Sequence, residues 1–210
     1  MTTRVLTVHG LARSPLSMVW LARALRRAGY PTEHFGYLAF AESYDRIVRR
    51  LRARMRTVAA RSRYAVVAHS LGGLLVREAL GDATVSLPYR VVMLGTPNRR
   101  SRMAEWAIRF PLWRWVVGEA GRRLADPAFY ETVHPLAAPY TLVAGTRGLR
   151  SGWLPLGGLV NDGLVALEET QLTPDDSVIA LPAGHSFMMN RRAVQQAVLQ
   201  ALRERASSTP

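Results

Sequence analysis

The sequence predicts an α/β protein: a three-layer sandwich built on a mostly parallel six-stranded sheet, with a short helical insertion. Short runs rich in valine and leucine alternate with longer segments of helical periodicity, which is typical of β-α-β units. Of the 210 residues, 49% are hydrophobic and 20% are charged, the ordinary range for a globular chain that buries one sizeable core. We therefore expect a single domain over residues 1–210.

Six runs have the length and residue types of buried strands. They are residues 4–8, 32–37, 64–68, 90–94, 140–144 and 177–181. Further segments place apolar residues at helical spacing. They are residues 15–28, 44–61, 71–80 and 191–206. Pro15 stands in the first turn of the first of these segments, and Gly29 and Gly81 follow the ends of two of them, which favours helix boundaries at these positions.

A serine stands where the third strand is expected to turn into a helix. Ser70 follows a run of small and apolar residues and precedes Leu-Gly-Gly. In a nucleophile elbow such a turn exposes the serine hydroxyl above the sheet, and the residues two before and two after the serine must be small. Ala68 and Gly72 meet this requirement, although Ala68 departs from the stricter glycine at its position. Ser70 is the candidate nucleophile, and a simple helix cap is the alternative role.

Acyl transfer by a serine also requires N–H donors that stabilise the oxyanion of the tetrahedral intermediate. The segment Val8-His-Gly-Leu ends the first strand, and from there a backbone N–H can point toward the same place as the N–H that follows the nucleophile. The backbone N–H groups of Leu11 and Leu71 are therefore the candidate oxyanion donors.

The candidate base is a histidine, because a serine hydroxyl is inert at neutral pH without one. His185 follows the last predicted strand, where a loop at the carboxyl edge of the sheet can return it to the serine. His69, beside the serine, is expected to point away from the hydroxyl. The remaining histidines fall in the oxyanion turn, in an early strand and in the insertion: His9, His34 and His134.

The acid that orients the base should come between nucleophile and base in the chain. Asp162 follows the fifth strand and precedes a glycine that permits a tight turn, so it is the candidate. Asp175 and Asp176 are rivals, but they stand before the last strand, at the opposite edge of the sheet, in a Pro-Asp-Asp turn pattern. Asp126 and Glu168 are weaker candidates.

Five ordered motifs resemble those of the α/β-hydrolase superfamily. They are Val8-His-Gly-Leu, Ala68-His-Ser-Leu-Gly-Gly, Leu94-Gly-Thr-Pro-Asn, Asn161-Asp-Gly-Leu-Val and Gly184-His-Ser-Phe. Within the superfamily the chain is similar to small bacterial esterases and lipases with a minimal six-stranded sheet. The resemblance implies cleavage of carboxylic esters without a cofactor or metal. Arg99-Arg-Ser departs from the pattern, since such lipases often have a small residue followed by serine there.

Three other functions remain open on the same fold. A thioesterase and an acyltransferase would use the same residues, and fold alone does not separate them from an esterase. A catalytically silent binding protein is the third alternative, against which the complete set of nucleophile, base and acid argues.

The insertion covers about 40 residues, 98–139, where a crossover between strands needs only about a dozen. It is rich in large aromatic residues: Trp106, Phe110, Trp113 and Trp115. They could form a helix packed on the sheet, or a short lid or pocket wall for acyl chains. We expect the pocket wall, because the insertion follows a strand whose carboxyl end faces the candidate site.

All 28 basic residues are arginine, and the formal net charge is +13. Residues 44–61 form an amphipathic basic helix, which we interpret as the solvated outer face of a helix on the sheet; contact with an anionic membrane is the second interpretation. No nucleic-acid motif is present, so no nucleic-acid partner is expected. The expected partner is a small-molecule or lipid ester. With no signal peptide or membrane-spanning segment found, we expect a cytoplasmic protein that could also lie peripherally on a membrane.

Overall fold

The computed structural model describes residues 3–110 and 117–204, and its centre is one six-stranded sheet. All neighbouring strands are parallel, in the order β2-β1-β3-β4-β5-β6. The strands are β1 (Arg4–Val8), β2 (Thr32–Phe35), β3 (Tyr64–His69), β4 (Val91–Leu94), β5 (Tyr140–Gly145) and β6 (Val178–Leu181). The predicted fold class is confirmed, and each predicted strand is present with its ends within two residues.

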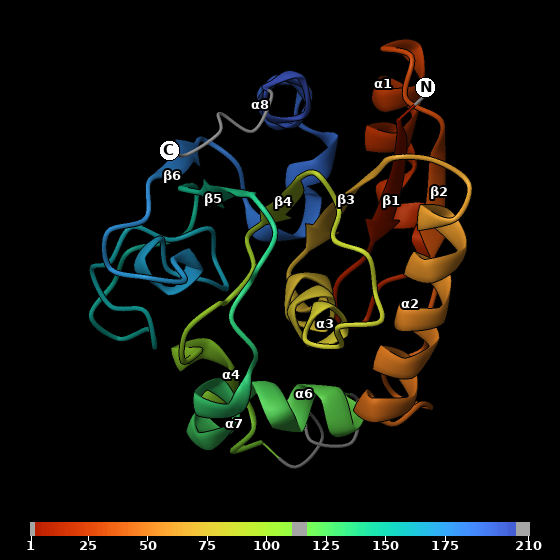
Figure 1. The fold of residues 1–210 in the computed structure, drawn as a ribbon. Helices are drawn as coiled ribbons and strands as arrows, with labels where there is room; N and C mark the ends of the chain where they lie inside the picture. Colours follow the sequence, from red (N-terminus) through yellow and green to blue (C-terminus); the bar gives the residue numbers. More distant parts are fainter. Residues whose placement is uncertain (1–2, 111–116, 205–210) are drawn as a thin grey trace.

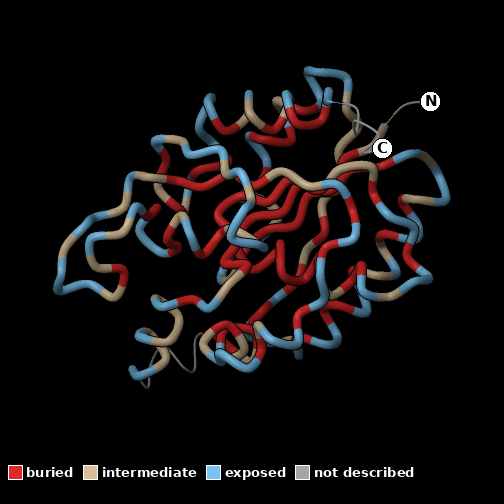
Figure 2. Tube along the Cα trace, turned by 60° about the vertical axis from the view of Figure 1, so that its left-hand side comes forward, coloured by how far each residue is buried: buried red, intermediate tan, exposed pale blue. Residues whose placement is uncertain are grey.

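Helices cover both faces of the sheet and make the three layers visible in Figure 1. One face packs against α2 (Tyr44–Ala59) and α3 (Leu71–Leu80), and the other against α1 (Val19–Arg27) and α8 (Arg192–Arg203). Alternation along β3 explains this, because Val66 and Ala68 belong to the first apolar core and Ala65 and Val67 to the second. Figure 2 shows the sheet as the buried centre of the molecule.

The four predicted helices are present, but α2 ends at Ala59 rather than at residue 61, and α8 spans Arg192–Arg203 rather than residues 191–206. The first segment begins as a 3₁₀ turn, η1 (Pro15–Met18), before α1. Gly29 has φ 89° and follows α1, as a left-handed helix terminator does. Gly81 also follows the end of its helix, as the C-cap residue of α3, but with a right-handed φ of −65°. A Cβ at this position would lie 2.5 Å from the His134 ring, so glycine is required there by close packing.

The insertion contributes three short helices among the described residues. They are α4 (Arg102–Ala107), α6 (Gly118–Leu124) and α7 (Pro127–Thr132). The side chains of Ser101 and Asp126 cap α4 and α7. Figure 1 shows these helices together, beyond α3 and away from α1 and α8. Trp113 and Trp115 lie outside the described residues.

Many arginines of α2 bind carboxylates of this same chain. Arg54 pairs with Glu33 at 2.7 Å, Arg52 pairs with Asp82 at 3.6 Å, and Arg50 pairs with Glu42. The apolar face of α2, by contrast, is fully buried against the sheet. These pairs favour the interpretation of α2 as the solvated outer layer. In the described part of the chain, no helix is long and apolar enough to cross a bilayer.

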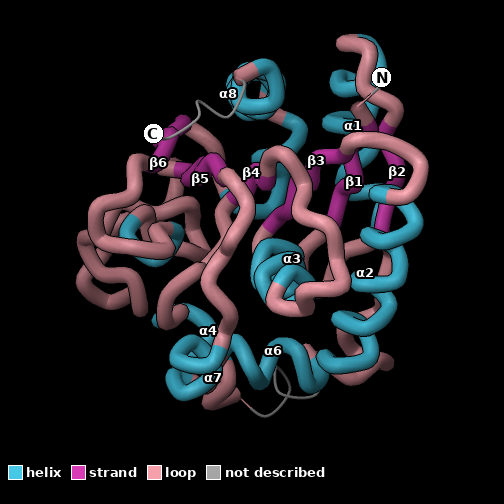
Figure 3. Tube along the Cα trace, in the orientation of Figure 1, coloured by secondary structure: helices cyan, strands magenta, loops and turns pink. Residues whose placement is uncertain are grey.

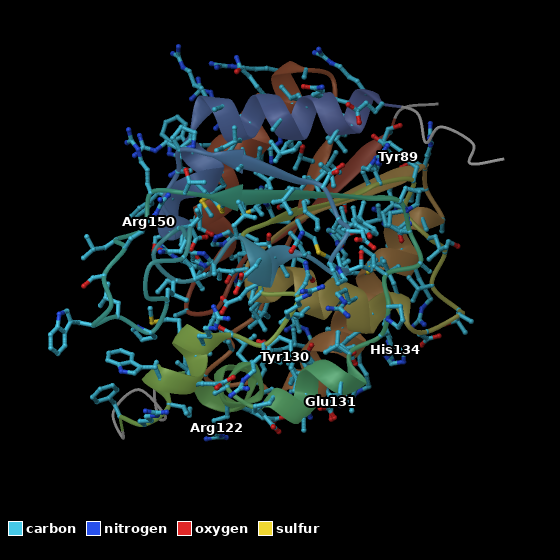
Figure 4. All side chains as sticks on the ribbon, turned by 90° about the vertical axis from the view of Figure 1, so that its left-hand side faces the viewer. Tyr89, Arg122, Tyr130, Glu131, His134 and Arg150 are labelled. Carbon is cyan, nitrogen blue, oxygen red and sulfur yellow. The ribbon has the colours of Figure 1, made fainter. Side chains whose placement is uncertain are left out.

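A long loop joins β5 to β6 and carries the candidate acid. It extends from the main body as the loop-rich side of Figure 3, and Arg150, labelled in Figure 4, lies on its outer part. The loop folds back through a bridge between Asn161 and Ala166, contains η2 (Glu168–Thr170) and then leads to β6. The last loop, after β6, leads into η3 (His185–Asn190).

Candidate active site

Ser70 occupies a strained turn between β3 and α3. Its φ and ψ are 53° and −126°, a conformation that costs about 1–3 kcal/mol for a residue with a side chain. Its side chain makes no hydrogen bond to the backbone of α3, so Ser70 does not act as a side-chain cap of this helix. Gly72 lets α3 start close to β1: a Cβ there would lie 2.7 Å from the carbonyl oxygens of both Val8 and His9. The local structure is the elbow that the sequence predicts.

His185 lies within hydrogen-bonding distance of the serine. Its Nε2 is 3.0 Å from Ser70 Oγ. The residue is the first of η3, and its backbone N–H donates to the carbonyl oxygen of Asp162 at 2.8 Å. The imidazole is buried, so its orientation is set by the protein rather than by solvent.

Asp162 completes a continuous chain of hydrogen bonds. Its Oδ2 is 2.7 Å from His185 Nδ1, and its Oδ1 accepts the backbone N–H groups of Leu164 at 3.0 Å and Val165 at 2.8 Å. The structure therefore brings Ser70, His185 and Asp162 together in the order expected from the sequence.

The rival carboxylates are used elsewhere. Asp176 accepts the N–H groups of Leu172 and Thr173, at 2.7 and 2.8 Å, and so builds the turn before β6. Asp126 caps α7. Glu168 pairs with Arg102.

The two candidate oxyanion donors both lie near the serine. Leu71 is the first residue of α3, and Leu11 lines the same pocket as Ser70. Within the described residues, neither N–H donates to another protein group, so both are free to bind an oxyanion. Gly10 permits the close approach, because a Cβ there would lie 3.0 Å from Ser70 Cβ.

His9 fixes the turn that carries Leu11. Its ring stacks on Tyr37 with 4.2 Å between centroids, and its Nδ1 donates to the Gly10 carbonyl oxygen at 2.9 Å. The Tyr37 hydroxyl donates to the His9 carbonyl oxygen at 2.8 Å. Burial lowers the pKa of His9, so the ring stays neutral and structural.

Sequence reasoning missed one contact of the site. His69 Nε2 lies 3.0 Å from the backbone carbonyl oxygen of His185, and the two rings are 4.9 Å apart. Burial, and to a smaller extent the charge on His185, lowers the pKa of His69 well below its usual value. As a neutral donor it holds the loop of the candidate base. The pattern His-Ser at the elbow is the only signal for this in the sequence.

An apolar pocket opens at Ser70. We refer to it as the acyl pocket; its volume is about 320 Å³. Apolar side chains from four regions line it: Leu11, Met103, Ala104, Ala107, Leu124, Leu164 and Val165. The insertion thus contributes a wall through α4 and α6.

The expectation that Trp106 and Phe110 face this pocket is wrong. They are 43% and 50% exposed and pack on each other with 4.8 Å between ring centroids. Met103, Ala104 and Ala107 take the inner side of α4 because they share one helical face. Among the residues that the structure describes, no three His, Asp or Glu side chains converge as a metal site would require.

No family model matches the chain, and no curated protein matches it by sequence. Solved structures do match its fold. A phospholipase of Legionella pneumophila, PlaB, in complex with thio-NAD, superposes with a TM-score of 0.73 at 16% identity over 98% of this chain and 59% of that chain. A structure from the work on LipS and LipT, metagenome-derived lipolytic enzymes, gives 0.69 at 16% identity, over 96% of this chain and 94% of that one.

A third structure, described as a hydrolase of the alpha/beta superfamily from Xanthomonas campestris, superposes with a TM-score of 0.62. The identity is 13%, over 96% of this chain and 98% of that one. The chain has the α/β-hydrolase fold. The match to an α/β-hydrolase extends over nearly all of this chain, although the chain spans only 59% of the phospholipase. At such identities the likeness is one of fold, and activity has to be argued from the site.

Proposed function

We propose that the chain is a serine hydrolase that cleaves carboxylic esters through an acyl-enzyme intermediate. The observation that carries this is the unbroken hydrogen-bond chain from Ser70 through His185 to Asp162, at the mouth of an apolar pocket. A nucleophile, a base within 3.0 Å of it and an orienting acid are the parts that acyl transfer requires.

The steps follow from the positions of these atoms. Ser70 Oγ attacks the ester carbonyl while His185 Nε2 takes its proton, and Asp162 stabilises the imidazolium through Nδ1. The N–H groups at positions 11 and 71 bind the oxyanion. His185 then gives the proton to the leaving alcohol. Water, activated by the same imidazole, releases the acid from Ser70.

The lining of the acyl pocket supports an ester with an apolar acyl chain. Most of the residues that line it are apolar, so methylene groups of a substrate gain free energy by leaving water. We propose a small-molecule or lipid ester as the substrate. A thioester, or transfer to an acceptor other than water, would use the same atoms.

Labelling with a fluorophosphonate probe tests this proposal. We expect the wild-type protein to be labelled and Ser70→Ala to be unlabelled, with loss of p-nitrophenyl butyrate hydrolysis on the order of 10⁶-fold. Ser151→Ala, in the outer loop, is the matched control and should be labelled as the wild type is. A folded Ser70→Ala protein that keeps a tenth of the activity would overturn the proposal. Parallel assays with the butyryl thioester separate an esterase from a thioesterase.

A further inference from the structure

A second hollow joins the acyl pocket at one point. We refer to it as the outer groove; it has a volume of about 670 Å³ and is lined largely by apolar side chains: Leu16, Trp20, Leu38, Phe40 and Phe187. The residues common to both hollows are Ala12, Arg13 and Ser186. The two hollows therefore adjoin at these residues, and the acyl pocket reaches Ser70.

The outer groove lies beside the residue that would protonate the leaving alcohol of an ester. The leaving oxygen of an ester must come within hydrogen-bonding distance of His185, which protonates it. Ser186 and Phe187 directly follow that histidine in the chain and line the outer groove. With the acyl chain in the acyl pocket, the alcohol part of the substrate leads into the outer groove.

Arg13 stands at the junction. Among the described residues that line either hollow, it is the sole arginine, aspartate or glutamate. Its guanidinium lies over the Phe187 ring, 5.0 Å from the centroid, and no carboxylate of the described chain lies within salt-bridge distance of it. This contrasts with α2, where Arg50, Arg52 and Arg54 are paired.

The charge of Arg13 is felt within the site. The pKa of His69 is lowered chiefly by burial, and Arg13 adds to this lowering through its charge. A guanidinium over an aromatic ring still has N–H groups available to form two parallel hydrogen bonds to a carboxylate or phosphate. An unpaired cation of this kind, between an apolar groove and a nucleophile, is suited to an anion that the substrate brings.

We infer that Arg13 binds an anionic group on the leaving-alcohol part of the substrate. The substrate class is an ester of an amphiphilic alcohol: its carboxylate or phosphate pairs with Arg13, its apolar part lies in the outer groove, and its acyl chain lies in the acyl pocket. The inference rests on the proposed function, and it adds a requirement for negative charge on one side of the ester bond.

A pair of soluble butyrate esters tests the charge requirement. One is the ester of 3-hydroxybenzoate, which is anionic, and the other is the ester of 3-hydroxybenzamide, which is neutral and of similar shape. The quantity measured is the ratio of kcat/KM for the anionic ester to kcat/KM for the neutral one. Comparing this ratio between proteins cancels the intrinsic reactivity of each ester.

We expect Arg13→Gln to lower the ratio about tenfold, as loss of a charge-assisted pair does, and Arg13→Lys to lower it less, because lysine keeps the charge but not the two parallel hydrogen bonds. Arg23→Gln is the matched control: Arg23 also lies over an aromatic ring, that of Trp20, but lines neither hollow. Its ratio should equal that of the wild type. Melting curves of all variants verify the fold.

Three outcomes would overturn the inference. The first is a ratio in Arg13→Gln within twofold of the wild type, and the second is an equal fall in Arg23→Gln, which would indicate a general effect of net charge. The third is an effect confined to esters in anionic phospholipid vesicles, which would make Arg13 a membrane-docking residue. The proposed function fails separately, if Ser70→Ala still hydrolyses the neutral ester.

Discussion

His69 donates a hydrogen bond from Nε2 to the backbone carbonyl oxygen of His185 at 3.0 Å. A carbonyl oxygen only accepts, so Nε2 carries a proton, and because burial lowers the pKa of His69 well below its usual value, the ring is neutral. The residue beside the proposed nucleophile therefore holds the loop that carries the proposed base. This makes His69 a positioning residue, which acts through His185 rather than on the substrate.

Replacing His69 by leucine should lower kcat about tenfold with little change in KM. The His185 carbonyl would lose its donor, and a buried polar group without a partner costs about 1–3 kcal/mol, so the loop would shift. His69→Gln keeps an N–H donor and should recover part of the loss. Steady-state kinetics of both variants give the answer, and equal kcat in leucine variant and wild type would contradict this role.

Asp162→Asn should reduce kcat by roughly 10⁴-fold, because an amide no longer fixes the tautomer of His185 or stabilises its charge. Asp176→Asn is the control: it alters the turn before β6, where the carboxylate accepts two backbone N–H groups, and should lower the melting temperature while kcat is retained. Equal, small losses of kcat in both variants would show that the acid has been misassigned.

Ala104→Leu should shorten the acyl chains that the protein accepts. Ala104 lines the acyl pocket, and each methylene that no longer fits forfeits up to about 0.8 kcal/mol, which is about fourfold in kcat/KM. Hydrolysis of an octanoyl ester should therefore fall far more than that of an acetyl ester.

The control for this variant is Trp106→Leu, on the outer side of α4. Its chain-length profile, measured with acetyl, butyryl and octanoyl esters, should match that of the wild type. If Ala104→Leu lowered all three esters equally, the acyl chain would bind elsewhere.

Glu169 should make the stability of the protein depend on pH. The side chain is 3% exposed, accepts the N–H groups of Ala166 and Arg102, and burial raises its pKa to about 7. Since the unfolded chain releases this proton near pH 4.5, the folded state binds more protons between about pH 4.5 and 7. Its contribution to stability therefore falls as pH rises through this window, by up to about 3 kcal/mol.

Urea unfolding of wild type and Glu169→Gln at pH 5 and pH 8 measures this effect, because glutamine does not titrate. The free energy of unfolding of the wild type should decline relative to the variant at the higher pH. A difference between the two proteins that stays constant over this range would show that Glu169 ionises normally in the fold.

The sequence predicted the central strands well because β3 and β4 are nearly continuous apolar runs, as in strands buried on both faces, whereas β2, with the sequence Thr-Glu-His-Phe, is a partly buried edge strand. It also predicted that Ser70, Asp162 and His185 would come together, since each follows a strand of the same parallel sheet and carboxyl ends meet at one edge. The second strand was predicted to extend to Tyr37, but β2 ends at Phe35, and the Tyr37 ring stacks on that of His9.

The rest depends on tertiary contacts that periodicity does not encode. The spacing of Trp106 and Phe110 indicates a helix but not which of its faces meets the sheet, and here the small residues face inward. The contact from His69 to His185 spans 116 positions in the chain. Arg13 differs from the paired arginines because no carboxylate among the described residues lies within salt-bridge distance of it, and no local sequence pattern reveals that.

One turn of the loop between β5 and β6 both holds Asp162 and lines the acyl pocket. Asp162 binds the N–H groups of Leu164 and Val165, and those two residues also line the acyl pocket. A substitution that reshapes this wall will therefore disturb the acid, so selection for a new substrate has little freedom here. The residues of α4 that line the acyl pocket are not the ones that donate hydrogen bonds to Asp162. Changes of substrate preference in descendants of this chain should therefore begin in α4.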